Sequence, residues 1–261
     1  MNKKHILSII VVVLISITFL NIQYTNSQIK DTIILWYQAI LPTVPVSYFL
    51  GTLLYHFHFI ISIFYPFFRK IYSFENKHSF ILYIISLIVG NPTSTLLIIN
   101  SLNNGEISYK EATRLLRFCS FVSIFFILFI LKPIYSFPVL FGQIMSTIVI
   151  SQKDRQKESY LNTKDEFSLI PIIEKLPFVL LNILSTMIFI TIIKTPFNII
   201  FSESKFLVPT FLSFFEITSG LTTITFLYTN IPLIFFSSLL ISFHGLAIII
   251  QVIIFLKQKM L

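Results

Sequence analysis

The feature that most constrains this chain is a series of long apolar runs that recurs from one end to the other. Residues 80–100, 176–193 and 233–256 contain no Asp, Glu, Lys or Arg. Each run is close to the roughly 20 residues that a helix needs to cross about 30 Å of hydrocarbon. Strands of a membrane barrel would alternate apolar and polar residues, whereas residues 176–193 are apolar on every face. We therefore predict an all-α, polytopic helical membrane protein that forms one membrane domain over residues 1–261.

The charge distribution narrows the choice of partners. Of the 261 residues, 55% are hydrophobic and 11% are charged, against roughly 25% charged in a soluble domain. The formal net charge of +8 is compatible with nucleic-acid binding, but the Lys and Arg residues lie in short clusters between the apolar runs. Cytoplasmic loops of membrane proteins carry such clusters. We therefore predict the lipid bilayer as a partner and no nucleic acid.

Signatures of catalysis and cofactors are missing from the sequence. The single cysteine, Cys119, permits no internal disulfide, and no Cys or His residues have metal-ligand spacing. The patterns G-x-x-x-x-G-K-[ST], G-x-S-x-G and H-E-x-x-H are absent as well. We expect a non-enzyme with no cofactor and no metal, and the sequence carries no signal of oligomeric state.

The first third of the chain contains an N-terminal helix and a broken one. Residues 1–31 hold two lysines before the apolar run 6–20 and a polar link after it, without a small-residue cleavage site. We therefore predict an uncleaved helix whose N-terminus is cytoplasmic. Residues 33–68 are too many for one straight span and include Pro42, Pro45 and Gly51. They predict a broken or strongly tilted helix.

Two apolar runs are interrupted at their centres by polar and helix-breaking residues. Residues 90–95 interrupt the run 80–100, and residues 216–220 interrupt the run 206–227. Irregular backbone survives at membrane depth only when it is buried in protein or faces a wet cavity. We predict two re-entrant hairpins, the first entering from the cytoplasm and the second from outside. The alternative for the first, a full crossing, would place the basic residues 110–117 outside and is disfavoured by the positive-inside rule.

The remaining segments complete a topology of about six spans. Residues 115–131 cross outward, residues 139–150 cross back, and the polar loop 152–166 is cytoplasmic. Residues 176–193 cross outward to an external segment that begins at Lys194. Residues 233–256 then cross inward, so the C-terminus is cytoplasmic in a multi-pass protein of the cell membrane.

The order of these elements predicts an inverted-topology repeat. The first half covers residues 32–135 and the second covers residues 167–261, joined by a span and loop over residues 136–166. Each half contains a hairpin with a central interruption, and the two halves have opposite orientations. This plan recurs among secondary transporters, because interrupted helices expose groups that bind a solute or ion near the membrane midplane. We therefore predict a small-molecule solute and a coupling ion as partners.

Glu216 is the only carboxylate within an apolar run, and a charge at this depth costs several kcal/mol or more. It either contributes to a binding site or caps a short half-helix. His244 is either a proton relay or a hydrogen-bonded structural residue, and the hydroxyls of the first interruption either bind solute or bond to their own helix. We predict that the two hairpin tips meet, with the backbone broken at Gly90, Pro92, Gly220 and Gly245. The predicted binding residues are Asn91, Thr93, Ser94, Thr95, Ser120, Ser123, Glu216, Thr218, Ser219, His244 and Gln251.

Four motifs in order resemble a known family. They are Gly90-Asn91-Pro92; residues 104–119, Asn-Gly-Glu-Ile-Ser to Arg-Leu-Leu-Arg-Phe-Cys; residues 215–220, Phe-Glu-Ile-Thr-Ser-Gly; and residues 242–246, Ser-Phe-His-Gly-Leu, followed by Gln251. This order is similar to that of the sporulation integral membrane protein YlbJ family, within the nucleoside-recognition or Gate domain group.

The resemblance implies a role in spore formation, namely transport of dipicolinate or a nucleoside-like molecule across a forespore membrane. The chain departs from the family where Asn-Asn-Ser-Gly-Pro usually follows the Phe-Cys pair, because residues 120–124 here are Ser-Phe-Val-Ser-Ile. His244 also stands in place of a glycine. The competing hypothesis from another class is a non-transporting scaffold or assembly protein of the spore envelope.

Overall fold

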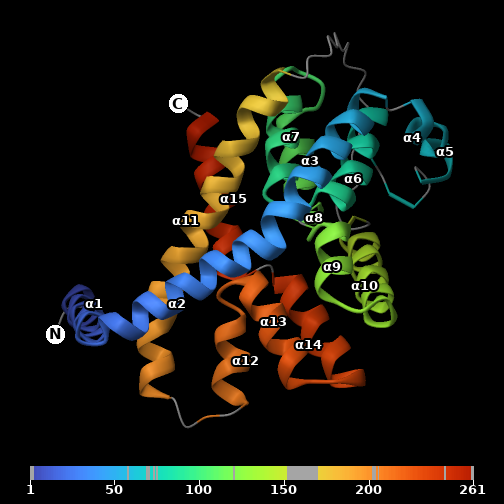
Figure 1. The fold of residues 1–261 in the computed structure, drawn as a ribbon. Coiled ribbons are helices and arrows are strands. Elements are labelled where there is room, and N and C mark those ends of the chain that lie inside the picture. Colours follow the sequence, from blue (N-terminus) through green and yellow to red (C-terminus); the bar gives the residue numbers. More distant parts are fainter. Residues whose placement is uncertain are drawn as a thin grey trace.

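The computed structural model describes residues 3–259, apart from 58, 69–70, 73, 75, 120, 152–169, 202–203, 205 and 244. Helices make up every regular element in these ranges, and no strand occurs among them. Figure 1 shows the arrangement. The predicted all-α class is therefore confirmed. The predicted cytoplasmic loop 152–166 lies outside the described residues.

The first half begins with three helical segments that form one long rod and continues with shorter helices. The rod consists of α2 (Ile22–Leu35), the π-helix η1 (Trp36–Ile40) and α3 (Leu41–His56), and it is preceded by α1 (Lys3–Leu20). The shorter helices are α4 (Phe59–Ile63), α5 (Tyr65–Phe68), α6 (Lys77–Val89), α7 (Thr93–Asn103), α8 (Tyr109–Phe118), α9 (Ile124–Ile130) and α10 (Pro133–Ser151).

The second half follows the same order with fewer elements. Its long helix is α11 (Ile170–Ile200), and its short helices are α12 (Leu207–Ser213), α13 (Ile217–Leu227), α14 (Asn230–Phe243) and α15 (Gly245–Lys259). In Figure 1, α6 and α7 lie in the upper part of the molecule, α12 and α13 lie in the lower part, and the two long rods cross between them. Each half thus contains a long helix, then a helical hairpin, then a helix in two pieces.

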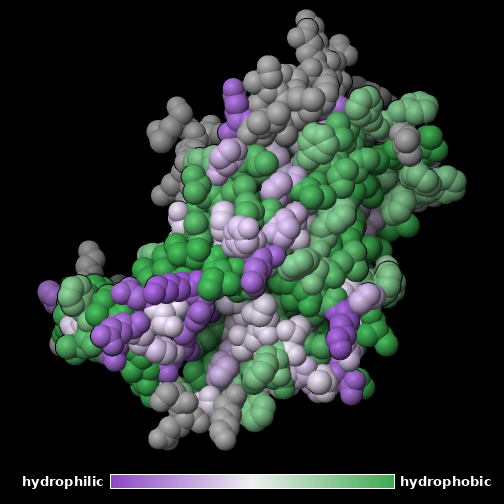
Figure 2. All heavy atoms as spheres, viewed as in Figure 1, coloured by the Kyte–Doolittle hydropathy of each residue, from purple (hydrophilic) through white to green (hydrophobic). Residues whose placement is uncertain are grey.

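Three stretches of helix in the described ranges are long and apolar enough to cross a membrane: Ile22–His56, Glu174–Ile200 and Asn230–Ile253. Large apolar side chains such as Phe49, Phe189 and Phe235 are exposed on them, and Figure 2 shows apolar residues over most of the visible face. Exposed apolar surface of this extent marks contact with lipid or with another protein. The structure is consistent with a helical membrane protein, and the number of six spans stays a prediction.

The predicted polar link near Lys30 and Asp31 is wrong, because both residues lie within α2. The helix continues there because its polar residues meet polar partners on α11. The hydroxyls of Thr32 and Thr191 lie 2.8 Å apart, and Trp36 donates its indole N–H to the carbonyl of Leu180 at 3.3 Å. These pairs also show that α2 and α11 run in opposite directions.

The predicted break in residues 33–68 comes later than the prolines suggest. Pro42 lies in the first turn of α3 and Pro45 lies inside it, yet the helix continues to His56. A π-helical turn directly precedes these prolines, and such a turn changes the hydrogen-bond spacing so that a missing N–H is tolerated.

Two predicted spans are each divided into two helices. Residues 115–131 are interrupted between Phe118 and Ile124, where the described residues 119 and 121–123 are not helical. Residues 233–256 are divided at Gly245, whose φ of 67° does not fit a right-handed helix. Neither predicted span is one continuous helix, because each interruption bonds to a hairpin tip, as described below. The crossing of the membrane over Asn230–Ile253 stays consistent with its length and composition.

Both predicted interruptions within hairpins are present, and each pair of helices folds back on itself. At the open end of the α6–α7 pair, Asn76 donates to the carbonyl of Glu106 at 3.0 Å. At the open end of the α12–α13 pair, the hydroxyls of Thr210 and Tyr228 lie 2.9 Å apart. The first and last residues of each pair are therefore neighbours, as a hairpin requires.

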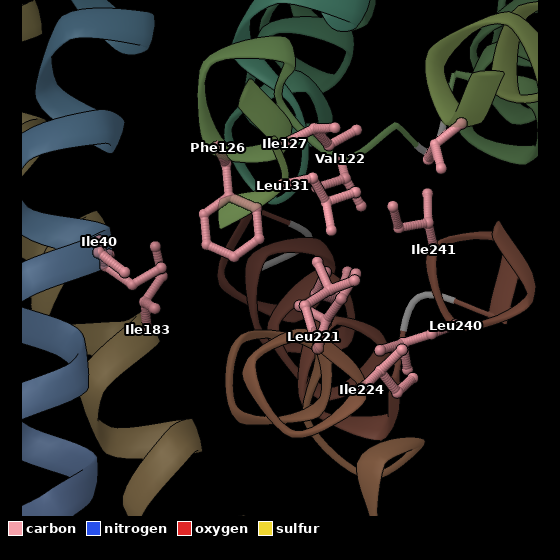
Figure 3. Close-up of a cluster of buried hydrophobic side chains, with 14 of the residues drawn as sticks. Ile40, Val122, Phe126, Ile127, Leu131, Ile183, Leu221, Ile224, Leu240 and Ile241 are labelled. Carbon is pink, nitrogen blue, oxygen red and sulfur yellow. The ribbon is translucent and has the colours of Figure 1, made fainter. Parts of the chain in front are cut away.

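A buried apolar cluster joins the two halves (Figure 3). It brings Phe126 and Ile127 of α9 together with Leu221 and Ile224 of α13, and Leu240 of α14 closes it. Ile224, Leu221 and Ile127 are fully buried. Because these side chains come from both halves, their packing fixes the position of one hairpin relative to the other.

Candidate functional site

The tip of the first hairpin is organised by Asn91. Gly90 ends α6 with a φ of 71°, and Asn91 then donates its backbone N–H to the carbonyl of Phe121 at 2.7 Å. The side-chain oxygen of Asn91 accepts hydrogen bonds from Ser94 at 2.6 Å and from Thr95 at 3.0 Å. The hydroxyls of Ser94 and Thr95 are thereby turned into the tip itself.

The interrupted helix between α8 and α9 completes this tip. The carbonyl of Phe121 accepts from Asn91, and the hydroxyl of Ser123 donates to the carbonyl of Ile88 at 2.8 Å. Ile88 lies in the last turn of α6, where carbonyls have no partner within the helix. The non-helical segment therefore satisfies backbone groups that hydrocarbon would leave without partners.

The tip of the second hairpin is organised by Glu216, which caps α13. Its two carboxylate oxygens accept the backbone N–H groups of Thr218 at 2.7 Å and Ser219 at 2.6 Å. A carboxylate at this position satisfies two free N–H groups and interacts favourably with the positive end of the helix. Of the two roles left open by the sequence, capping is the one that the structure shows. Ala247 also donates to the carbonyl of Phe215 at 3.1 Å, so the interruption before α15 bonds to this tip.

Lys194 is a partner of the second tip that the sequence analysis did not include in the site. It was expected to begin an external segment, but it lies inside α11, which continues to Ile200. Its ammonium group donates to the hydroxyl of Ser219 at 2.9 Å, and it interacts electrostatically with Glu216. Helical spacing was the available signal, because Thr191, Lys194 and Asn198 recur at three- and four-residue intervals on one face of an apolar helix.

The two hairpin tips border one small cavity, here called the tip cavity, of about 50 Å³. A space of this size holds a few water molecules or one small ion. Apolar side chains of α3, α9 and α11 close it on other sides. The predicted site residues that line it are Asn91, Pro92, Thr93, Ser123, Glu216, Thr218 and Gln251.

The remaining predicted residues do not line the tip cavity. Ser94 and Thr95 bond to Asn91 as described, and Ser219 faces Lys194. Gly90, Gly220 and Gly245 serve close packing: a methyl group on Gly90 would meet the backbone of Ser123, and one on Gly220 would meet the carbonyl of Ser213. Ser120 and His244 lie outside the described residues.

A larger cavity of about 520 Å³ adjoins the tip cavity and is here called the arginine cavity. The two share Asn91 and Ile248 as lining residues. Arg117, Gln143 and Ser146 supply its polar groups, and apolar residues of α14 and α15 complete it. The sequence analysis treated Arg117 as a loop charge and gave it no part in a site.

A third cavity, of about 270 Å³, lies on the other side of the second tip and is here called the lysine cavity. Lys194 and Asp31 line it, and Ser219 separates it from Glu216. The other polar lining residues come from α2, α11 and α13: Gln28, Thr32, Thr191, Asn198, Thr222 and Thr223. Figure 2 shows hydrophilic residues gathered along α2, which forms one wall.

The open end of the first hairpin contains a buried acidic cluster that the sequence analysis did not single out. The carboxylate of Glu106 accepts from the hydroxyl of Tyr55 at 2.6 Å and lies 2.8 Å from the ring nitrogen of His78. Burial by itself would raise the pKa of Glu106, but hydrogen bonds from His78, Tyr55 and Ser101 outweigh burial and lower the pKa to about 2. The cluster links α3 to the start of α6 and to the segment that follows α7.

No protein-family model, no curated protein and no solved structure matches this chain. The likeness to the YlbJ family therefore stays an expectation based on motifs, and the function is argued below from the residues of this chain.

Proposed function

We propose that the chain is a secondary transporter of a small solute, built as an inverted repeat around the tip cavity. The observation that carries the proposal is the meeting of two opposed hairpin tips at one cavity. Free backbone groups are unfavourable in hydrocarbon. Secondary transporters gather helix interruptions at their binding sites, and four interruptions meet at one place in this fold. By the motif resemblance, the solute is dipicolinate or a nucleoside-like molecule, and the membrane is that of a forespore.

The arrangement of the three cavities supports alternating access. The arginine cavity reaches the tip cavity at Asn91 and Ile248. The lysine cavity approaches it from the other hairpin, where residues 216–219 form the wall between them. A solute that enters one cavity and leaves through the other passes both tips. With the predicted topology, the arginine cavity faces the cytoplasm.

The pairing of hairpins with interrupted helices also favours transport over a scaffold. Each tip holds the interrupted helix of its own half through one backbone hydrogen bond, Asn91 to Phe121 in the first and Ala247 to Phe215 in the second. The tip donates in the first half and accepts in the second, so the two halves share a contact between tip and interrupted helix but not its direction. Such paired contacts are expected of a transporter with inverted repeats. A scaffold protein needs no such symmetry.

The test is solute counterflow in proteoliposomes that contain the Cys119→Ser protein, with labelled dipicolinate and a labelled nucleoside in separate experiments. Single cysteines are then placed in the arginine cavity (Ser146→Cys) and in the lysine cavity (Thr222→Cys). We expect a membrane-impermeant thiol reagent to block flux from opposite faces in the two variants. Thr113→Cys, which lines neither cavity, is the matched control and keeps full flux after labelling.

Three results would count against the transporter or its proposed route. Absence of flux for both solutes in protein that is folded and correctly inserted would favour the scaffold. Block of both cysteine variants from the same face would contradict access through two cavities, and flux that labelling does not alter would show that the route lies elsewhere.

A further inference from the structure

The two hairpin tips differ in how their helix starts are satisfied. The first turn of α13 is capped by the carboxylate of Glu216. The first turn of α7 has Pro92 at the capping position and receives no hydrogen bond from a capping side chain. Asn91 does not take this role, since its side-chain oxygen accepts from Ser94 and Thr95. In the first turn of α7, Ser94 donates its backbone N–H to the carbonyl of Gly90 at 2.9 Å. The backbone N–H of Thr93, a residue that lines the tip cavity, has no acceptor among the described residues.

Two buried hydroxyls face the same space. Thr93 begins α7 and Thr218 lies in the first turn of α13, and both line the tip cavity although each side chain is only 2% exposed. Within the described part of the chain, neither hydroxyl has a hydrogen-bond partner, whereas Ser94, Thr95 and Ser219 beside them all do. A buried hydroxyl without a partner is uncommon and indicates a bound water molecule or ligand.

The charges around the cavity allow an anion despite the presence of Glu216. Both oxygens of this carboxylate point to backbone N–H groups, and Lys194 lies beside it. Of the described residues that line the tip cavity, Glu216 is the only ionisable one. An anion there meets N–H and O–H donors, and the carboxylate of Glu216 is already bonded to two backbone N–H groups.

We propose that the tip cavity is an anion site, in which the backbone N–H of Thr93 at the start of α7 and the hydroxyls of Thr93 and Thr218 bind one carboxylate group or one halide ion. Glu216 shows that a carboxylate can bind a helix start in this protein, because its oxygens accept backbone N–H groups in the first turn of α13. The volume of about 50 Å³ admits a group of this size and excludes an aromatic ring. If the proposed transport function holds, the anion is either the carboxylate end of the solute or the coupling ion.

The test is anion binding to the purified full-length protein in lipid nanodiscs. Formate and bromide are titrated separately at constant ionic strength, with a bulky sulfonate as the balancing anion, and followed by calorimetry and by the midpoint of thermal unfolding. We expect saturable binding of at least one of the two. Saturation by formate alone assigns the site to a carboxylate, saturation by bromide alone assigns it to an inorganic ion, and either supports the proposal.

Variants connect the binding to these residues. Thr93→Val removes the hydroxyl at nearly constant volume and is expected to weaken the anion roughly tenfold or more, as for loss of a hydrogen bond to a charged group. Thr93→Ser restores the hydroxyl and the affinity, and Thr218→Val provides an independent test should Thr93→Val fold poorly. Thr225→Val is the matched control, because its hydroxyl bonds to the carbonyl of Thr222 at 2.8 Å within α13.

The proposal is overturned if neither anion binds saturably, which would mean that the cavity holds only water, or if Thr93→Val and Thr218→Val bind as tightly as the unaltered protein. These outcomes are separable from those of the flux experiment. Anion binding without flux in proteoliposomes would contradict transport and keep the site, and flux without anion binding would do the reverse.

Discussion

The contact between Glu216 and Lys194 provides the most quantitative prediction. In Glu216→Gln, the neutral amide oxygen replaces a carboxylate that accepts from Thr218 at 2.7 Å and from Ser219 at 2.6 Å. At least one charge-assisted hydrogen bond is lost, at about 1.5–3 kcal/mol, and Lys194 is left without its negative neighbour. We expect a total loss of about 2–4 kcal/mol for Glu216→Gln, because Lys194 keeps its hydrogen bond to Ser219 at 2.9 Å. In Lys194→Met, the loss is smaller, about 1–3 kcal/mol, because Glu216 keeps both N–H bonds.

The double variant separates a true pair from two independent effects. Because Lys194→Met also removes the uncompensated charge, the double variant is expected to be more stable than the sum of the single losses by about 1–3 kcal/mol. The measurement is the free energy of unfolding from reversible SDS titration in mixed micelles, followed by circular dichroism. Lys132→Met, at an exposed lysine before α10, is the matched control, and its effect should add to that of Glu216→Gln within about 0.5 kcal/mol. Additivity in the Glu216 and Lys194 pair would refute the reasoning.

Further predictions concern glycine packing, pH and the core. Gly90→Ala and Gly220→Ala should lower folded yield, because the new methyl groups meet the backbone of Ser123 and the carbonyl of Ser213. Gly142→Ala, in open space within α10, should instead stabilise the protein by about 0.5–1 kcal/mol. Equal yields of the three variants by size-exclusion chromatography would contradict this. The pKa of Glu106 is lowered from 4.5 to about 2, so the carboxylate adds about 3 kcal/mol of stability above pH 4.5 that is lost as the pH falls toward 2. The pH profile of unfolding should flatten in this range for Glu106→Gln, and an unchanged profile would show that the cluster is not responsible. Ile224 is fully buried, so Ile224→Val should cost about 1 kcal/mol and Ile224→Ala about 2–5 kcal/mol in the same titration, and equal losses would argue against a close-packed core.

The interruptions of the hairpins were predictable because they combine two signals. Gly90 and Pro92 disfavour helix, and polar side chains accompany them within an otherwise apolar run. Glu216 and Gly220 mark the second interruption in the same way. Sequence reasoning also placed both tips at one site, and Asn91, Thr93 and Thr218 do line one cavity there.

The interruptions at residues 119–123 and at Gly245 were missed for the opposite reason. Residues 119–123 are mostly apolar, and apolar composition does not distinguish helix from extended backbone. What interrupts the helix is a tertiary bond, since the carbonyl of Phe121 accepts from Asn91. Such a bond becomes visible only when the hairpin is in place. Gly245 carried a local signal, but one glycine in a run of 24 apolar residues is tolerated often enough to be overlooked.

Lys194 and Asp31 were misplaced because charges were taken to mark loops. The positive-inside rule applies to residues near the ends of spans, and it does not describe a lysine inside a long helix that bonds to another helix. Residues 28, 31 and 32 on α2 and residues 191, 194 and 198 on α11 form two polar stripes at helical spacing. Their pairing was predictable in principle from periodicity, but their distance from Glu216 was not.

The crossing of the two long helices also contains an intrinsic fluorescence probe. The chain has one tryptophan, and Trp36 lies in the π-helical turn with its indole bonded to Leu180 of the opposite half. Its emission spectrum depends on the polarity around the indole and on this hydrogen bond. Intrinsic fluorescence of the unmodified chain therefore reports on a single place, the contact between halves, and a spectral change on adding a solute would register relative motion of the two long helices without any attached dye.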